Sequence, residues 1–267
     1  MTTTPTRTDA CAVSLARTPD GRVRVTAGGG PFRVITLGVD ERGARVALVP
    51  TRALLLAGDV VEVECDVADG LTLHLQETSG TVAYDMRGGS ASWSFAARVG
   101  AGARLVLDSL PWVSAGGSRV TRSTSVSLGA AATLLARETL VLGRSGEAPG
   151  GLVSRTTITR EGRPVVVEEL QALHLAPHRI LDSVLALGDG PDLIEGGPSP
   201  LRLESGDRLW RRLGREAHET AAVLDPVWDA ARVLGQGTPG LFTARRPTTR
   251  APRTGRTSGP SLPPRSP

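Results

Sequence analysis

Apolar and polar residues alternate with a period of two through most of this chain before residue 200. In VVEVECDV (60–67), three valines and Cys65 would face one side of an extended strand, and the three acids would face the other. The segment LTLHLQ (71–76) repeats the pattern with its leucines. Because successive side chains of a strand point to opposite faces, each segment predicts a strand with one buried side.

Further segments of this kind follow one another along the chain. They cover residues 22–25, 32–37, 44–49, 91–99, 103–108, 119–128, 132–142, 152–160, 164–170 and 178–187. Turn residues separate them, and Asp69-Gly70 is typical of a two-residue hairpin. No helical pattern intervenes, so a parallel sheet with crossover helices is not expected. The sequence predicts a mainly β protein with a large antiparallel or stacked-sheet domain, either a β-sandwich or β-helix-like.

The pattern changes after the Gly/Pro-rich segment 195–200. Residues 205–224 place apolar side chains at helical spacing, and residues 226–235 resemble a second short helix that begins near Pro226. About two helices near the C-terminus are therefore predicted. We expect residues 9–243 to form one domain with its helical end at about 205–235, after a disordered N-terminus at 1–8.

The basic charge of the chain is concentrated in its C-terminal tail. All 31 basic residues are arginine, the net charge is +4, and six arginines with no acid lie in residues 244–267. Removing those six leaves the remainder of the chain at −2, so the charge does not indicate a nucleic-acid partner. The Arg/Pro-rich composition of residues 244–267 predicts a disordered, solvated tail.

Familiar signatures of catalytic and cofactor sites are missing from the sequence. We find no P-loop, GxSxG or HExxH motif. Cys11 and Cys65 are too isolated to suggest a disulfide framework, and Cys65 fits a buried free thiol. His174 and His178 stand four residues apart, but Pro177 disfavours the helix that would bring them together. Without a signal-peptide pattern or a long apolar run, we expect a cytoplasmic protein with no membrane segment.

A series of short motifs keeps a fixed order between residues 30 and 190. They are Gly58-Asp59 before an acidic strand, Thr78 and Tyr84, Pro111 with Gly117 and Arg119, Gly129 through Glu138, Leu142-Gly143-Arg144, Gly146-Glu147, and Gly162-Arg163-Pro164. In this order they resemble the UreD (also called UreH) urease accessory proteins. The chain departs from that pattern at the glycines that precede Gly58 and at Val106, where the family has a glutamate.

The resemblance implies a mostly β, non-enzymatic scaffold for urease maturation. It implies complexes with UreF, UreG and urease apoprotein. We further expect the helical end (205–235) to form part of the UreF contact. The resemblance also implies passage of Ni²⁺ toward urease, as a transient ion rather than a tightly bound cofactor. From charge and hydropathy we expect no nucleic-acid or membrane partner. By matched position, the candidate metal ligands are Asp59, Glu138 and Glu147. The candidate partner-binding residues are Tyr84, Trp112, Arg119, Arg144 and Trp210.

Structural roles remain open for many of these residues. Arg119 and Arg144 could hold loops through bidentate contacts to carboxylates. Trp93, Trp210 and Trp228 fit core positions, whereas Trp112 could be either a core residue or an exposed interface anchor. An alternative function is a ligand- or carbohydrate-binding β-sandwich, which would need exposed aromatic side chains. A hydrolase on a β scaffold would need converging acid and base groups.

Overall fold

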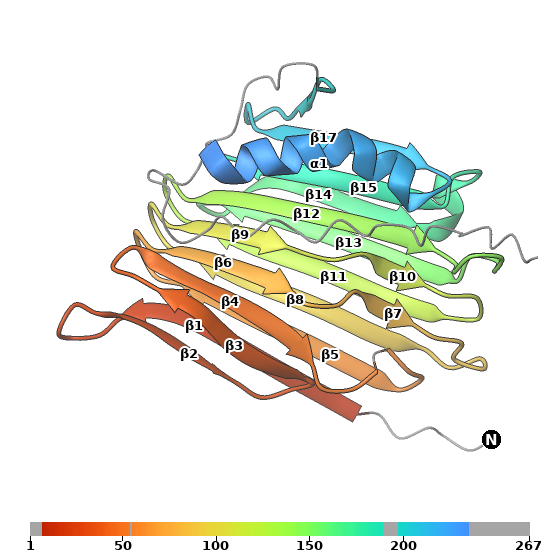
Figure 1. Cartoon of the computed structure of the whole chain (residues 1–267), viewed down its shortest axis with the longest axis horizontal. Helices are drawn as coiled ribbons and strands as arrows, with labels where there is room; N and C mark the ends of the chain where they lie inside the picture. The colour runs from red at the N-terminus through yellow and green to blue at the C-terminus, as the bar shows by residue number, and fades with distance from the viewer. Residues whose placement is uncertain (1–6, 54, 189–196, 235–267) are drawn as a thin grey trace, which may run out of the picture.

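The computed structural model describes residues 7–53, 55–188 and 197–234, which form two stacked β-sheets and a helix (Figure 1). Sheet A has seven strands in the order β14-β13-β11-β8-β5-β1-β2. Their bounds are β1 Arg7–Arg17, β2 Val23–Gly28, β5 Asp59–Val67, β8 Ala91–Val99, β11 Arg119–Leu128, β13 Gly151–Arg160 and β14 Arg163–Gln171.

Sheet B has ten strands, eight of them in the order β16-β17-β15-β12-β9-β6-β4-β3, with β10 pairing to β12 and β7. Their bounds are β3 Phe32–Val39, β4 Gly43–Pro50, β6 Thr72–Glu77, β7 Thr81–Ala83, β9 Arg104–Asp108, β10 Trp112–Ser114, β12 Thr133–Leu142, β15 Ile180–Leu187, β16 Leu201–Arg202 and β17 Arg208–Gly214. A short 3-10 helix, η1 (Ala172–Leu175), lies between β14 and β15.

From β4 to β13 the chain alternates between the sheets and winds as a two-layer solenoid. Within sheet A, β5, β8, β11 and β13 pair in parallel, and within sheet B, β4, β6, β9 and β12 do the same. Antiparallel pairs lie at the ends, where β1 pairs with β2, β3 with β4, β13 with β14, and β15 with β12 and β17. The predicted fold class is confirmed, in its β-helix-like form.

The turn at Asp69-Gly70 is a correction to the hairpin prediction. Gly70 has a positive φ of 65°, as a tight turn requires, but β5 and β6 belong to different sheets. The turn therefore carries the chain from one layer to the other. Alternation of apolar residues predicts a strand with one buried face, and it does not distinguish a partner in the same sheet from a partner in the facing sheet.

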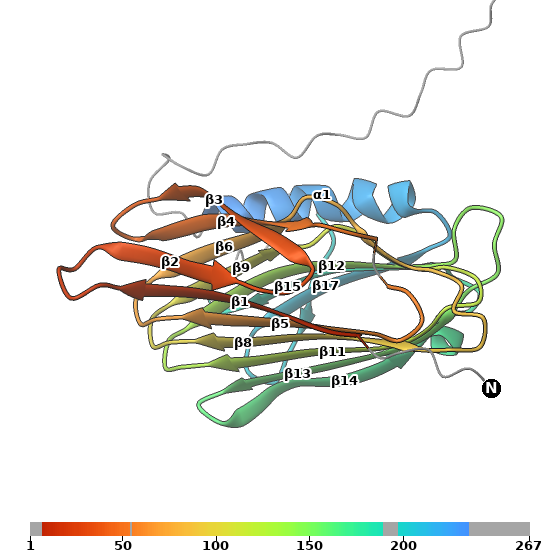
Figure 2. The ribbon, with the colours of Figure 1, turned by 90° about the horizontal axis from the view of Figure 1, so that it is seen from below.

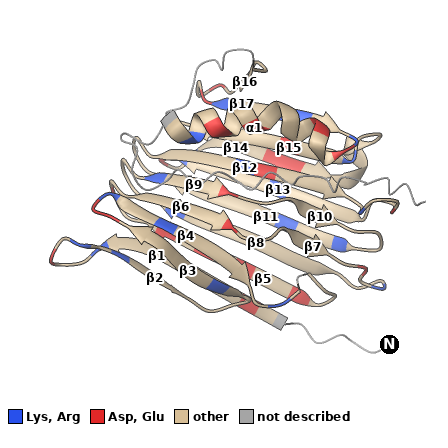
Figure 3. Ribbon diagram, in the orientation of Figure 1, with Lys and Arg blue, Asp and Glu red and all other residues tan. Residues whose placement is uncertain are grey.

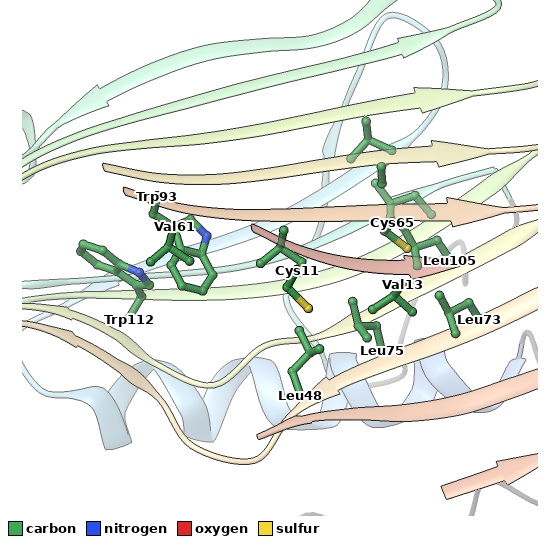
Figure 4. Close-up of a cluster of buried hydrophobic side chains, with 14 of the residues drawn as sticks. Cys11, Val13, Leu48, Val61, Cys65, Leu73, Leu75, Trp93, Leu105 and Trp112 are labelled. Carbon is green, nitrogen blue, oxygen red and sulfur yellow. The ribbon is translucent and has the colours of Figure 1, made fainter. Parts of the chain in front are cut away.

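Residues on the inner faces of the two sheets form the main core. Along β5 the apolar positions from Val61 to Val67 are at most 4% exposed, whereas the three acids between them are exposed. They pack between the layers with leucines of β6 and β9, as Figure 4 shows. Phe32 and Trp93 add an edge-to-face contact with ring centroids 5.8 Å apart. Cys11 and Cys65 are buried free thiols, as predicted for Cys65.

The described C-terminal part contains a strand and one helix where the sequence predicted two helices. Residues 208–214 form β17, which extends sheet B, and one α-helix follows among the described residues, α1 (Ala217–Leu234), with Pro226 inside it. The apolar residues of 208–214 fit either a helix face or a strand, and pairing with β15 makes them a strand. Helix α1 lies on the outer face of sheet B, opposite sheet A (Figure 2). Leu224, Val227 and Trp228 pack there in a second, smaller core.

Candidate functional site

Long connections gather at one end of the solenoid, where strands of sheet B end and strands of sheet A begin. They are residues 51–58, 78–90, 109–118 and 143–150, and this end is on the right in Figure 1. We call it the long-loop end. Asp59, Tyr84, Trp112, Arg119, Arg144 and Glu147 all lie in or beside these connections. Six of the eight candidate residues, from widely separated positions in the sequence, therefore share one end of the molecule.

Asp59 begins β5 and is 6% exposed. Its carboxylate accepts hydrogen bonds from both terminal nitrogens of Arg52, at 3.0 and 3.2 Å, and from the amide of Leu56 at 2.8 Å. Arg52 also pairs with Asp9 of β1. These hydrogen bonds raise the pKa of Arg52, the bond to Asp59 most strongly, against the opposing effect of burial. One guanidinium thus holds two carboxylates and fastens the 51–58 connection to the start of sheet A.

Glu147 and Arg144 face each other in the 143–150 connection. Arg144 Nε donates to Glu147 Oε1 at 2.9 Å, and the amides of Gly116 and Arg144 each donate to Oε2 at 3.3 Å. The hydrogen bond from the Arg144 side chain is the largest cause that lowers the pKa of Glu147 to about 2. Glu147 is therefore ionised at any physiological pH. Its carboxylate also joins two connections, because Gly116 belongs to 109–118.

Arg179 is a residue of this end that sequence reasoning missed. Its guanidinium donates to the carbonyls of Leu142, Arg144 and Glu147 at 3.0, 2.6 and 3.1 Å. Gly143 lies next to the Arg179 guanidinium and has a φ of +78°. A Cβ at Gly143 would stand 2.8 Å from Arg179 Nη2. The Leu-Gly-Arg motif thus needs its glycine for both conformation and space. No signal in the sequence links Arg179 to residues more than 30 positions away.

Tyr84 and Arg119 complete the polar surface of this end. Tyr84 is half-buried, and the amide of Tyr84 donates to the carbonyl of Leu55 at 3.1 Å. The pKa of Arg144 is raised, mainly by its hydrogen bond to Glu147, with a small contribution from Tyr84. Arg119 begins β11 and is exposed. Tyr84, Arg119 and Arg144 therefore offer side chains at the surface.

Glu138 lies away from the long-loop end, on the inner face of β12. It pairs with Arg122 of β11 in the facing sheet, and Arg122 Nη1 also donates to Ser154 Oγ of β13 at 3.2 Å. The Arg122 and Glu138 side chains are 11% and 26% exposed. Nearby, Arg211 of β17 pairs with Glu168 of β14 at 2.9 Å. The last coils of the solenoid are therefore joined between the layers by ion pairs.

The two tryptophans among the partner-binding candidates lie in the two cores. Trp112 is 5% exposed and packs between the sheets, and Trp210 is 1% exposed beneath α1, where its indole nitrogen donates to the carbonyl of Pro198 at 3.1 Å. Neither ring is at the surface in this structure. Their burial therefore supports a structural role in the core for both tryptophans, and not a role as exposed interface anchors.

The three candidate metal ligands do not converge. Asp59, Glu138 and Glu147 belong to separate clusters, and each pairs with a different arginine. Within residues 7–53, 55–188 and 197–234, no group of three or more His, Cys, Asp and Glu side chains is placed to hold a metal ion. The arrangement provides single, arginine-bound carboxylates rather than a preformed cage. Of the predicted disordered ends, residues 1–6 and 244–267 lie outside the described residues, and Arg7 and Thr8 are a correction because they begin strand β1.

No helix in the described ranges is both long enough and apolar enough to cross a membrane.

Comparison with known proteins gives a consistent result. Residues 10–246 match the family described as UreD urease accessory protein. Over 169 residues the chain is 44% identical to urease accessory protein UreD 1 of Streptomyces griseus, covering 60% of this chain and 65% of that protein. It is 40% identical over 177 residues to urease accessory protein UreD of Streptomyces coelicolor, covering 64% and 68%. The matched segment thus spans about two thirds of the length of these relatives.

Proposed function

Since the chain belongs to the UreD urease accessory protein family, we propose that it is a urease maturation factor that binds urease apoprotein, UreF and UreG. In this proposal it helps to deliver Ni²⁺ to the urease active site and catalyses no reaction itself. Nickel is its cargo, not a resident cofactor. The observation that carries the proposal is the family match over residues 10–246, together with the position of most of the matched motifs, but not of Gly129 through Glu138 or Gly162-Arg163-Pro164, at the long-loop end.

The candidate carboxylates suit brief contact with a divalent cation. Asp59, Glu138 and Glu147 provide hard oxygen donors, and none stands beside a thiolate or a second carboxylate of the candidate set. A metal ion would have to displace an arginine from each of them, which favours weak binding and release. Because the pKa of Glu147 is about 2, this carboxylate needs no deprotonation before it meets Ni²⁺.

The exposed arginines of the long-loop end suit a protein partner. Arg119 and Arg144 lie at the surface with the half-buried Tyr84, and tyrosine and arginine are enriched at interface hot spots. The pair Arg144–Glu147 also stiffens the loop that presents them. We place one docking surface of the scaffold there.

Burial of the tryptophans disfavours the alternative of a carbohydrate-binding module, which would need exposed aromatic side chains. All four tryptophans of the chain, at positions 93, 112, 210 and 228, are at most 5% exposed. They form parts of the two cores rather than a stacking platform for sugar rings. The hydrolase alternative has no support from the candidate carboxylates, since each pairs with an arginine instead of a second acid or base.

Co-expression tests the proposal directly. The full chain, carrying a purification tag, is produced with UreF, UreG and the urease subunits of the same host, and bound proteins, urease nickel content and urease activity are measured. We expect a complex to co-purify, and nickel-dependent activity to require this chain. Absence of both association and any effect on urease would refute the scaffold role.

Two exchanges at the long-loop end separate partner binding from nickel transfer. Arg144→Glu should reduce the amount of co-purified partner, whereas Glu147→Gln should mainly lower the nickel content of urease in a complex that still forms. Glu161→Gln is the control, because Glu161 is an exposed acid in the tight turn between β13 and β14 at the opposite end. If Glu161→Gln lowers the nickel content of urease as much as Glu147→Gln does, the assignment of nickel transfer to the long-loop end is wrong.

A further inference from the structure

The space between the two sheets is closed at the first coil of the solenoid but, among the described residues, not at the last coil. At the first coil, β2 of sheet A and β3 of sheet B contact each other and close the space between the layers. At the last coil, sheet A ends at β14 and sheet B ends at β17 and the two-residue β16. In a solenoid each coil buries its apolar face against the next, so the last coil needs a cap. Within the described residues, no further strand covers this end.

A cavity of about 450 Å³ opens between these last strands, and we call it the terminal groove. Five leucines, one from each surrounding element, give it an apolar lining: Leu170, Leu175, Leu181, Leu201 and Leu213. Leu175 and Leu181 form a floor that is 6% and 2% exposed. Leu201 and Leu213 form a rim that is 59% and 41% exposed. Such exposed apolar residues beside a buried floor mark a binding surface rather than ordinary surface leucines.

The free edge of β17 carries one positive charge without an ion-pair partner among the described residues, on the outer face of the strand, while Arg211 and Leu213 face the groove. Arg211 is neutralised by Glu168 across the groove. Arg212 is exposed and forms no ion pair with the described residues. Its cross-strand neighbour, Asp182 of β15, is instead paired with Arg137 at 2.9 Å. His178 adds a buried Nδ1 that has no hydrogen-bond partner among the described residues. An occupant would gain from a carboxylate beside Arg212.

Open backbone edges flank the groove on both sides. Strand β14 pairs only with β13, and β16 covers β17 only at Arg208 and Leu209. Unpaired edges of this kind bind extended segments through main-chain hydrogen bonds. The geometry therefore suits an extended chain more than a helix or a small molecule.

We propose that the terminal groove binds a short extended segment of a partner protein that carries at least two large aliphatic side chains and a carboxylate. The segment lies along the free edge of β17, so that its alternate side chains point to opposite faces. The aliphatic side chains cover the five leucines and cap the solenoid, and the carboxylate on the other face pairs with Arg212. The inference deepens the proposed scaffold role, on which it rests for the idea that the partner is a component of urease maturation. It assigns that partner a site distinct from the long-loop surface of Tyr84, Arg119 and Arg144.

Synthetic peptides test the groove without a natural partner. Fluorescent peptides of alternating Leu and Glu, alternating Leu and Lys, and alternating Ser and Glu are titrated into the full chain and followed by anisotropy. We expect the Leu–Glu peptide to bind at least about tenfold more tightly than either control, because it alone supplies both apolar side chains and carboxylates. Equal binding of the three peptides would overturn the proposal.

Substitutions in the groove sharpen this test. Arg212→Glu should reverse the preference between the Glu and Lys peptides, and Leu213→Ser should weaken the Leu–Glu peptide by about tenfold or more. Leu37→Ser is the matched control, since Leu37 is 48% exposed on β3 at the other end of sheet B. Unchanged binding in Arg212→Glu and Leu213→Ser, at wild-type thermal stability, would also overturn the proposal.

The same variants in the co-expressed assembly distinguish the two proposals. If the wild-type chain assembles with the urease components and both groove variants assemble equally well, the scaffold role stands and the groove inference falls. If the wild-type chain does not assemble, the scaffold role falls and the peptide titrations alone decide the groove. A dimer of the chain that Leu213→Ser dissociates in sedimentation would replace the partner segment by a second copy and overturn the assignment.

Discussion

Pairing with arginine determines the chemistry of individual carboxylates in this protein. Asp59, Glu138 and Glu147 are each held by a guanidinium, and Asp182 is held in the same way under α1. The positions of Asp59, Glu138 and Glu147 could be proposed from the sequence through the matched motifs, whereas Asp182 belongs to none of them. Of their arginine partners, only Arg144 was proposed to contact a carboxylate. Arg122 and Arg137 reach Glu138 and Asp182 from other strands, and no motif includes Arg52, although it is only seven positions from Asp59.

The acid titration of Glu147 follows from its partner. Its pKa is lowered to about 2 in the folded chain, against an ordinary value of 4.5. The contribution of Glu147 to folding is therefore fully present above about pH 4.5 and is lost as the pH falls toward 2. Carboxyl-carbon NMR should show Glu147 ionised at pH 3.5, and Arg144→Met should return its pKa toward 4.5. Arg155→Met, which breaks a separate exposed pair with Glu169, should leave the Glu147 titration unchanged.

Two glycines of the same connection give a matched pair. Gly143 and Gly146 have φ of +78° and +77°, but a Cβ at Gly143 would lie 2.8 Å from the Ala148 carbonyl, whereas a Cβ at Gly146 meets nothing within 4 Å. Gly146→Ala should cost about 1–2 kcal/mol through conformation alone. Gly143→Ala should cost more, as measured by denaturant unfolding. Equal losses would show that space around Gly143 is not limiting.

Among the secondary-structure elements, α1 is fastened to sheet B by a buried arginine. Arg137 of β12 is 2% exposed and pairs with Asp182 of β15 at 2.9 Å and with Asp225 of α1 at 2.6 Å, while Thr139 donates to Asp182 at 3.0 Å. Burial opposes the charge of Arg137, and its hydrogen bonds to Asp182 and Asp225 outweigh burial, so its pKa is raised. One side chain thus joins two strands and the helix.

Substitution of Arg137 should lower the free energy of unfolding much more than substitution of the exposed Asp225. Arg137→Ala leaves Asp182, which is 1% exposed, as an unpaired buried charge, and should lower the free energy of unfolding by about 3–5 kcal/mol. Asp225→Asn changes a partner that is 53% exposed and should cost at most about 1 kcal/mol. Urea denaturation measures both. Similar losses in the two variants would mean that the network does not depend on burial.

At the scale of the whole molecule, the solenoid makes stability local. From β4 to β13 each strand pairs in its sheet with strands one coil away. Figure 3 shows charged residues mostly toward the strand ends, in the connections and on α1, and the coils are held together mainly by the apolar layer between the sheets. A defect in one coil is therefore expected to weaken its neighbours and to leave distant coils intact.

A core truncation near the first coil tests this expectation. Phe32 begins β3, is 7% exposed and contacts Trp93 of β8, so Phe32→Ala should cost about 3–5 kcal/mol. Amide hydrogen exchange should accelerate in β1 to β8 and remain slow in β13, β15 and β17. Uniform acceleration along the chain would indicate a single cooperative unit instead.

The sequence by itself determined most of the strands between residues 22 and 187 and which of their faces are buried, but not β1 or β17. Alternation in β5, β11 and β12 is a local property, since a strand needs only a period of two to present one apolar face. The sequence also placed the glycine turns and, through the order of its motifs, the family. These features depend on residues within a few positions of one another, so the sequence contains them directly.

Only the tertiary structure decided how those strands are connected and what their polar residues contact. The same turn can join two strands of one sheet or two facing sheets, and Asp69-Gly70 does the second. Residues 208–214 became a strand because β15 offered an open edge. Arg137 and Asp182 are 45 positions apart and meet only when the coils stack. Pairing over such separations depends on the packing of the whole chain, which no local pattern encodes.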